Sequence, residues 1–111
     1  MNIKNRLQLI GHLGASPEVK SLDNGNKIAK FAIATSEFYT NKKGEKVTET
    51  QWHNIVIWGK LANIAERYLE KGSQVVIDGK LTTRNYTDKE GVKKYFTEIV
   101  ANELLLLDKK A

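Results

Sequence analysis

Apolar and polar residues alternate with a period of two in five stretches of the chain, and this pattern predicts five β-strands. Turn signals separate the stretches: an Asn-Gly pair lies in residues 22–27, and polar, lysine-rich connectors span residues 40–49 and 87–94. The predicted strands are NRLQLIGHLG (5–14), KIAKFAIATSEF (27–38), QWHNIVIWG (51–59), SQVVIDGKLTTRNY (73–86) and a last one from about Tyr95 to Leu107.

A helical period interrupts the alternation between the third and fourth strands. In KLANIAERYLEKG (60–72), apolar residues recur at the i, i+3, i+4, i+7 and i+8 spacing of one helix face. We expect this helix to bury Tyr68 in the core and to be closed by Gly72 in a left-handed conformation. The apolar face consists of Leu61, Ile64, Ala65, Tyr68 and Leu69.

The order of elements is three strands, one helix and two strands. This is the order of the OB-fold, a five-stranded Greek-key barrel. An open α+β sheet covered by one helix has the same pattern, so alternation alone leaves both architectures open. No repeat divides the 111 residues, and the chain is expected to form one domain.

The third strand has two apolar faces, and their composition predicts which one is buried. Side chains alternate across a strand, so both tryptophans of the chain share one face. If that face were the core, Asn54 would be buried with them, whereas the other face is a purer aliphatic stripe. We therefore expect exposed tryptophans and a buried isoleucine face. The first face carries Trp52, Asn54, Val56 and Trp58, and the second carries His53, Ile55 and Ile57.

The charge balance favours an anionic partner without establishing one. Lysine and arginine number 18 and aspartate and glutamate 13, a net charge of +5. The absence of cysteine excludes disulfides and thiolate chemistry. There is no signal-peptide pattern, and the longest aliphatic run, LLLL (104–107), falls far short of the roughly 20 residues of a membrane span. We expect a cytoplasmic protein that contacts no membrane.

Catalytic and metal-binding patterns are weak. The two histidines, His12 and His53, stand apart in the sequence and lack the spacing of a metal-ligand pair. No Walker-type phosphate loop occurs, and no nucleophile with an adjacent base can be identified. The sequence therefore predicts a protein that is not an enzyme and that needs no cofactor or metal.

Aromatic residues recur beside lysines and arginines on the predicted strands and at the bases of the predicted loops. Unpaired bases stack on aromatic side chains, and phosphates need cations, so this combination suits single-stranded nucleic acid. Phe38 and Tyr39 lead into the first lysine-rich connector, and Tyr86 shares a face with Arg84 and precedes the second connector. The connector lysines singled out for phosphate contact are Lys42, Lys43, Lys46, Lys93 and Lys94.

Five blocks of the chain, in order, resemble the bacterial single-stranded DNA-binding protein family. They are LIGHLGASPEV (9–19), FAIATSE (31–37), WHNIVIWGKLANIAERYLEKGSQVVIDGKL (52–81), TRNYTD (83–88) and YFTEIVANEL (95–104). The resemblance implies an OB-fold domain over residues 1–108 that assembles as a homotetramer built from dimers. It also implies sequence-tolerant binding of single-stranded DNA in replication, recombination and repair, and a nucleoid-associated location in the cytoplasm.

The resemblance also implies roles for individual residues. The stacking positions of the family hold aromatic residues here, namely Tyr39, Trp52, Trp58 and Tyr86. The basic positions implied to contact DNA are Arg6, Lys42, Lys43, Lys60, Lys71 and Arg84. The positions implied to lie at a subunit interface are Leu7, Leu9 and His53.

The sequence departs from the family pattern in two respects. Asn54, Thr82 and Asn85 stand where many relatives carry a basic residue, which predicts weaker or more salt-sensitive binding. The family usually continues into a Gly/Pro/Gln-rich tail with an acidic tip, whereas this sequence ends in a short basic stretch, residues 109–111. Recruitment of replication and repair partners through such a tail is therefore not supported by this chain.

Two other functions remain compatible with the sequence. One is that of a primosomal replication protein, a short OB-fold dimer that acts as an adaptor for proteins and single-stranded DNA. The other is that of an OB-fold module that binds a saccharide or a protein. Aromatic residues at all four stacking positions favour single-stranded DNA over both.

Overall fold

The computed structural model describes residues 4–22 and 25–107, and within them the chain forms six strands and one helix. The predicted basic end, residues 109–111, lies outside the described residues. None of the described segments forms a helix that is long and apolar enough to cross a membrane. In chain order the elements are β1 (Leu7–Leu13), β2 (Glu18–Ser21), β3 (Lys27–Thr40), β4 (Lys46–Trp58), α1 (Lys60–Tyr68), β5 (Gln74–Thr87) and β6 (Lys93–Leu106).

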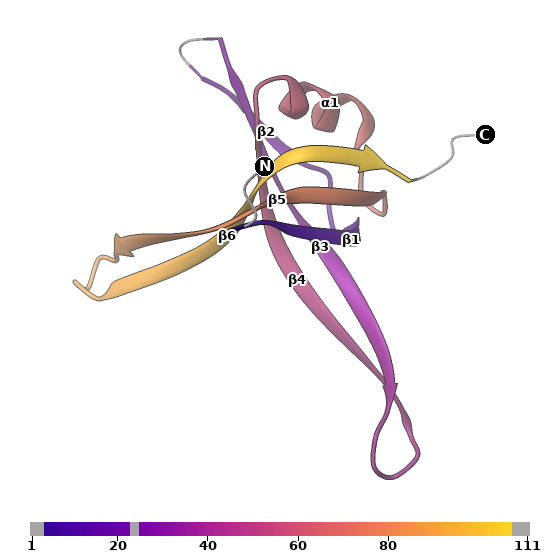
Figure 1. The fold of residues 1–111 in the computed structure, drawn as a ribbon. Coiled ribbons are helices and arrows are strands. Elements are labelled where there is room, and N and C mark those ends of the chain that lie inside the picture. The colour runs from indigo at the N-terminus through magenta and orange to yellow at the C-terminus, as the bar shows by residue number, and fades with distance from the viewer. Residues whose placement is uncertain (1–3, 23–24, 108–111) are drawn as a thin grey trace.

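Five of the strands close into a barrel. Hydrogen-bonded neighbours follow the order β1-β5-β6-β4-β3, and β1 also pairs with β3 through His12 and Leu13, which completes the ring. β4 and β6 run parallel, and the other neighbours in the ring run antiparallel. Helix α1 packs against β3 and β4 (Figure 1). The OB-fold prediction is confirmed, and the open-sheet alternative is wrong.

A short sixth strand is present that the hydrophobic pattern does not reveal. β2 pairs antiparallel with the beginning of β3, outside the closed ring. Its one apolar residue, Val19, packs against the core. A strand of four residues with a single apolar position is too short to produce a recognisable period of two.

Two long hairpins project from the barrel as arms (Figure 1). We call the outer part of the β3–β4 hairpin, residues 34–52, the first arm, and that of the β5–β6 hairpin, residues 82–98, the second arm. β3 and β4 stay paired out to Thr40 and Lys46, and β5 and β6 out to Thr87 and Lys93. The radius of gyration is 16.3 Å, whereas a compact domain of this length has about 13 Å. The arms account for this excess and leave a large strand surface outside the barrel.

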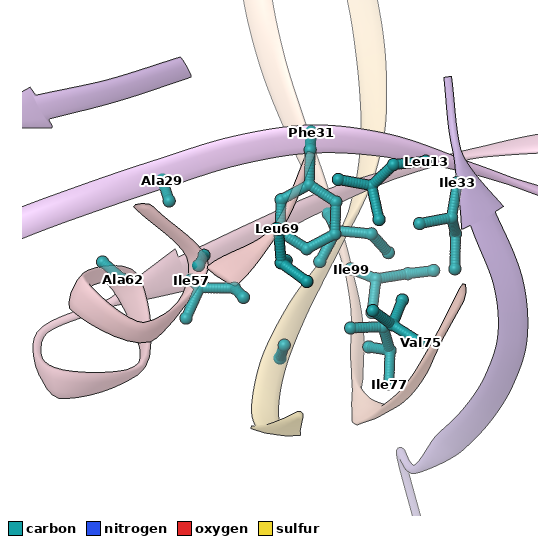
Figure 2. Close-up of a cluster of buried hydrophobic side chains, with 13 residues drawn as sticks. Leu13, Ala29, Phe31, Ile33, Ile57, Ala62, Leu69, Val75, Ile77 and Ile99 are labelled. Carbon is teal, nitrogen blue, oxygen red and sulfur yellow. The ribbon is translucent and has the colours of Figure 1, made fainter. Parts of the chain in front are cut away.

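The core fills the barrel with aliphatic side chains and the ring of Phe31 (Figure 2). Ile55 and Ile57 of β4 are completely enclosed, which confirms the predicted buried face of that strand. Val56, which alternation assigns to the exposed face, is also buried. Its strand is paired on both sides at this point, with Lys30 of β3 and Val100 of β6, so these neighbouring side chains flank it on the outer face.

Helix α1 is shorter than predicted and buries a narrower face. It ends at Tyr68, because Leu69 adopts an extended backbone conformation, and Gly72 uses its left-handed conformation in the following turn. Ala62 and Ala65 are the buried residues of the helix. The prediction that Tyr68 is a core residue is wrong: its side chain is 45% exposed. Small alanines let the helix approach the barrel closely, which leaves no room beneath it for a tyrosine ring.

Candidate nucleic-acid interface

The four aromatic residues predicted to stack on bases all lie on strands and are at least half exposed. The exposed fractions are 50% for Tyr39, 60% for Trp52, 51% for Trp58 and 51% for Tyr86. Aromatic side chains of this size are mostly buried in folded domains, because each removes a large apolar area from water. Four exposed rings on regular strands therefore indicate a surface for a ligand with flat apolar faces.

A groove of about 570 Å³ brings one of these aromatic residues together with a predicted basic residue. Its walls come from the loop between β1 and β2 and from the bases of both arms. Trp52 of β4 and Arg84 of β5 line it, with Asn54 beside them. Residues more than 30 positions apart in sequence thus meet where the two arms leave the barrel (Figure 1).

Arg84 is held by a carboxylate inside this groove. Its Nε lies 3.0 Å from Oε1 of Glu98, and its Nη2 lies 3.2 Å from Oε2 of the same residue. Glu98 is 6% exposed, so the carboxylate depends on Arg84 to compensate its buried charge. The sequence predicts only that Arg84 is a basic residue that contacts DNA. The structure shows that its guanidinium is already in a bidentate ion pair.

Two smaller pockets hold the other predicted stacking residues of the arms. Tyr86 lines a pocket of about 430 Å³ on the second arm, together with Arg84 and Phe96. Tyr39 lines a pocket of about 320 Å³ on the first arm, where Lys46 and Phe38 accompany it. Each arm therefore presents an aromatic ring beside a basic side chain, as the sequence predicts.

Strand register divides the aromatic residues of the first arm between two faces. Ala34 pairs with Trp52, and Phe38 pairs with Thr48, so alternation places Phe38 on the same strand face as Trp52. Tyr39 lies on the opposite face, and Phe38 is the more exposed of the two, at 77%. Phe38 is thus an aromatic candidate that the sequence-based set omits.

The predicted basic residues fall into two groups. Arg6 pairs with Asp78 at 2.8 Å, Arg84 pairs with Glu98, and Lys94 pairs with Asp88 at 3.4 Å. The other group has no carboxylate partner among residues 4–22 and 25–107, which leaves its charges available to an anionic ligand. Its members are Lys42, Lys43, Lys46, Lys60, Lys71 and Lys93.

Arg6 lies outside the groove, on the outer face of β1 and β5. The hydrogen bond from its guanidinium lowers the pKa of the Asp78 carboxyl, and Asp78 in turn raises the pKa of Arg6. A phosphate contact at Arg6 would require this ion pair to open. The contact of Arg6 with DNA stays a prediction.

The Single-strand binding protein family model matches residues 4–107, which is nearly the whole chain. The chain belongs to this family. A protein of Xylella fastidiosa described as Single-stranded DNA-binding protein 1 is 44% identical over 107 residues, covering 96% of this chain and 79% of that protein. A protein of the same description from Chlorobaculum tepidum is 47% identical over 107 residues, covering 96% of this chain and 66% of that protein.

A solved structure agrees with the family assignment. The Plasmodium falciparum SSB, in a complex with ssDNA, superposes on this single-strand binding protein family member with a TM-score of 0.86 and 36% sequence identity. The match covers 97% of this chain and all of that one. The barrel and both arms therefore follow the architecture of a protein whose structure was solved with single-stranded DNA bound.

The tips of the two arms of this family member share one turn geometry. Asn41 accepts hydrogen bonds through Oδ1 from the backbone N–H groups of Lys43 and Glu45, at 2.9 and 3.0 Å. Asp88 does the same for Glu90 and Val92, both at 2.9 Å. The hydrogen bond from the Val92 N–H lowers the pKa of the Asp88 carboxyl, and the hydrogen bonds from the Glu90 N–H and from Lys94 lower it further. These bonds fix the tips, at which the unpaired lysines Lys42, Lys43, Lys46 and Lys93 lie.

The three positions predicted to form a subunit interface all have contacts within their own chain. Leu7 and Leu9 point inward and pack against the core of their own chain. His53 is half-buried, and its Nε2 lies 2.9 Å from Oγ1 of Thr35, so this imidazole has a hydrogen-bond partner within its own chain. β1 pairs with β3 only at its last two residues, so the backbone of residues 7–11 has no strand partner on that side in the described part of the chain.

Three exposed aromatic residues on the arms are absent from the predicted stacking set: Phe38, Tyr95 and Phe96. Phe96 lines both the groove and the adjoining Tyr86 pocket. The signal that locates it is the Asp-x-x-Gly turn of the second arm, which sets the register that pairs Phe96 with Arg84. Among the described residues, no group of three or more His, Asp or Glu side chains could hold a metal ion.

Proposed function

We propose that this chain binds single-stranded DNA without strong sequence preference and protects exposed strands during replication, recombination and repair. The observation that carries the proposal is the groove between the arms, where the exposed ring of Trp52 stands beside Arg84. Stacking contributes about 1–3 kcal/mol per base and accepts every base, because each has a π-face. A non-enzymatic role in the cytoplasm, at the nucleoid, belongs to the same proposal.

The unpaired lysines supply the electrostatic part of the proposed binding. For single strands, each phosphate contact changes the slope of log Kobs against log salt concentration by about −0.7. The lysines of the arm tips, Lys42, Lys43 and Lys46, stand beside the Tyr39 pocket or at the turn next to it. A strand that follows the arms would meet both aromatic rings and cations.

The test is an equilibrium titration of labelled oligo-dT and of a duplex of equal length, read by fluorescence anisotropy at several salt concentrations. The proposal expects tight binding of oligo-dT, much weaker binding of the duplex, and a steep loss of affinity with salt. Equal affinity for both nucleic acids, or an affinity for oligo-dT that does not change with salt, would contradict it.

We also infer that the chain functions as a homotetramer built from dimers. The unpaired edge of β1 is an open template for a second strand, since exposed strand edges tend to pair. Ile10 and Leu105 flank Val76 in the register of β1, β5 and β6, and both are more than half exposed, which forms an apolar patch on the outer barrel face. Light scattering measures the solution mass: a tetramer agrees with this inference, and a dimer favours the primosomal type of adaptor.

A further inference from the structure

We propose that Trp52, Phe96 and the Arg84–Glu98 ion pair form a pocket for one unpaired base of the bound strand. Within this pocket, Arg84 contacts the base and does not contact a phosphate. The inference rests on the proposed function and assigns the base-binding role to two residues, Phe96 and Glu98, outside the predicted set. Four observations lead to it.

The first observation is the size and lining of the groove. Its volume, about 570 Å³, lies within the range of roughly 300–1,000 Å³ of pockets that hold small organic ligands. Trp52 of β4 and Phe96 of β6 belong to different arms and both line it. An unstacked base that enters the groove therefore meets aromatic surface from both arms.

The second observation is the place of Phe96 between the predicted stacking residues. Phe96 lines the groove that contains Trp52 and also the neighbouring pocket that contains Tyr86. It pairs with Arg84 across the second arm and shares the strand face of that residue. Phe96 thus lies between the groove of Trp52 and the pocket of Tyr86 and lines both.

The third observation is the charge state of the pocket. Arg84 and Glu98 form two hydrogen bonds, at 3.0 and 3.2 Å, and the net charge of the pair is zero. Thr82 of the same arm donates its hydroxyl to the backbone carbonyl of Glu98, which holds that strand position in place. Removal of Arg84 alone would leave a buried carboxylate without a partner, so the pair acts as one unit.

The fourth observation is what a paired guanidinium can still do. Its plane stacks on bases and aromatic rings, and the N–H groups that Glu98 does not use can donate to oxygen acceptors of a base. Arg84 remains largely exposed on the groove side of the pair, with 59% of its side chain accessible. Because its charge is already compensated, contact with Arg84 releases few counterions, whereas contact of an unpaired lysine with a phosphate of a single strand releases about 0.7 counterion.

Two pairs of variants test the pocket in oligo-dT titrations at several salt concentrations. The first pair is Phe96→Ala and its matched control Tyr95→Ala, which removes the neighbouring aromatic ring on the opposite face of the same strand. We expect Phe96→Ala to weaken binding roughly tenfold and Tyr95→Ala to change it less than about twofold. Affinity of Phe96→Ala within about twofold of the parent overturns the proposal.

The second pair separates base contact from phosphate contact. The double variant Arg84→Gln/Glu98→Gln removes both charges without leaving one buried alone, and we expect lower affinity with an unchanged salt slope. Glu98→Gln alone leaves the Arg84 charge uncompensated beside the bound strand, so the slope should become steeper than that of the parent. A double variant whose slope is shallower by about 0.7 shows that Arg84 contacts a phosphate, and this overturns the proposal.

The failure of this proposal is distinguishable from the failure of the proposed function. If the parent chain does not bind oligo-dT, the function is wrong and the pocket has no ligand. If the parent binds but the variants give the overturning results, the function stands and the pocket is wrong. Circular dichroism melting of each variant, compared with the parent, ensures that only folded proteins are scored.

Discussion

The indole ring of Trp52 lies directly against the backbone of Gly14. A Cβ atom built on Gly14 would stand 2.6 Å from Cζ3 and 2.8 Å from Cη2 of the ring, closer than real carbon contacts. The ring is thus supported by the loop after β1, and it lines the groove together with Gly14 while staying 60% exposed. Gly14 is the residue that allows Trp52 to occupy this position.

Gly14→Ala should therefore displace the Trp52 ring and weaken binding of oligo-dT severalfold without unfolding the barrel. The backbone of Gly14 is not in the left-handed region, so alanine is tolerated there apart from the contact with the ring. The measurement is the affinity of Gly14→Ala in the parent and in a Trp52→Ala background. The glycine substitution should have no further effect once the ring is absent. An equal loss in both backgrounds would mean that Gly14 acts independently of Trp52.

Trp52→Ala and Trp58→Ala should each reduce the free energy of oligo-dT binding by about 1–3 kcal/mol, because each removes one stacking surface. Tyr68→Ala provides the control, since Tyr68 is similarly exposed but lies on α1, outside the groove and the arms. Isothermal titration calorimetry of the three variants gives the comparison. If the tryptophan variants bind oligo-dT as tightly as the parent, bases do not stack on Trp52 and Trp58.

Lys43→Gln should make the salt slope of oligo-dT binding shallower by about 0.7, because Lys43 has no acidic partner in the described part of the chain. Lys27→Gln is the matched control: Nζ of Lys27 lies 2.8 Å from Oε1 of Glu66, so its charge is already compensated. Titrations over a salt series determine both slopes. If Lys27→Gln changes the slope as much as Lys43→Gln, ion pairing does not decide which lysines contact phosphate.

The tip of the second arm should lose order in acid. The pKa of Asp88 is lowered in the folded chain, so its contribution to stability is present above the carboxyl's usual pKa of about 4 and is lost as the pH falls through the lower folded value. Asp88→Asn should abolish this dependence while keeping the turn, because Asn41 makes the same hydrogen bonds in the first arm. Amide hydrogen exchange at Glu90 and Val92 between about pH 5 and 2.5 measures the effect. Identical acid profiles for the parent chain and the Asp88→Asn variant would show that the carboxylate has no such role.

The barrel was predictable because its core strands are buried on one face and exposed on the other. Alternation at Ile55 and Ile57 correctly identified the buried face, and the exposed Asn54 correctly identified the tryptophan face. Tyr68 was assigned wrongly, and the burial of Val56 on the tryptophan face was not predicted, because the burial of both depends on which neighbours cover them. A hydrophobic period of two or of 3.6 residues describes one strand or one helix. It contains no information on which other elements pack over that strand or helix.

The arms and the groove were only partly predictable. Residues 46–50 carry a single apolar side chain, Val47, so no alternation in their pattern distinguishes an extended hairpin from a loop, although β4 begins at Lys46. The pairing of Arg84 with Glu98 depends on the register of the second arm, which the turn at Asp88 sets. Sequence reasoning found the ring and the cation at this site but missed the carboxylate that compensates the cation.

The stacking of bases on the two tryptophans is the central claim, and intrinsic fluorescence tests it most directly. The chain has two tryptophans, so Trp52→Phe and Trp58→Phe each leave one tryptophan as the fluorescent reporter. The phenylalanine retains an aromatic ring at the substituted position. The account predicts that saturating oligo-dT quenches the remaining tryptophan strongly in both variants, and that duplex DNA at the same concentration does not. An emission that stays unchanged in either variant while oligo-dT is bound would contradict stacking at that tryptophan.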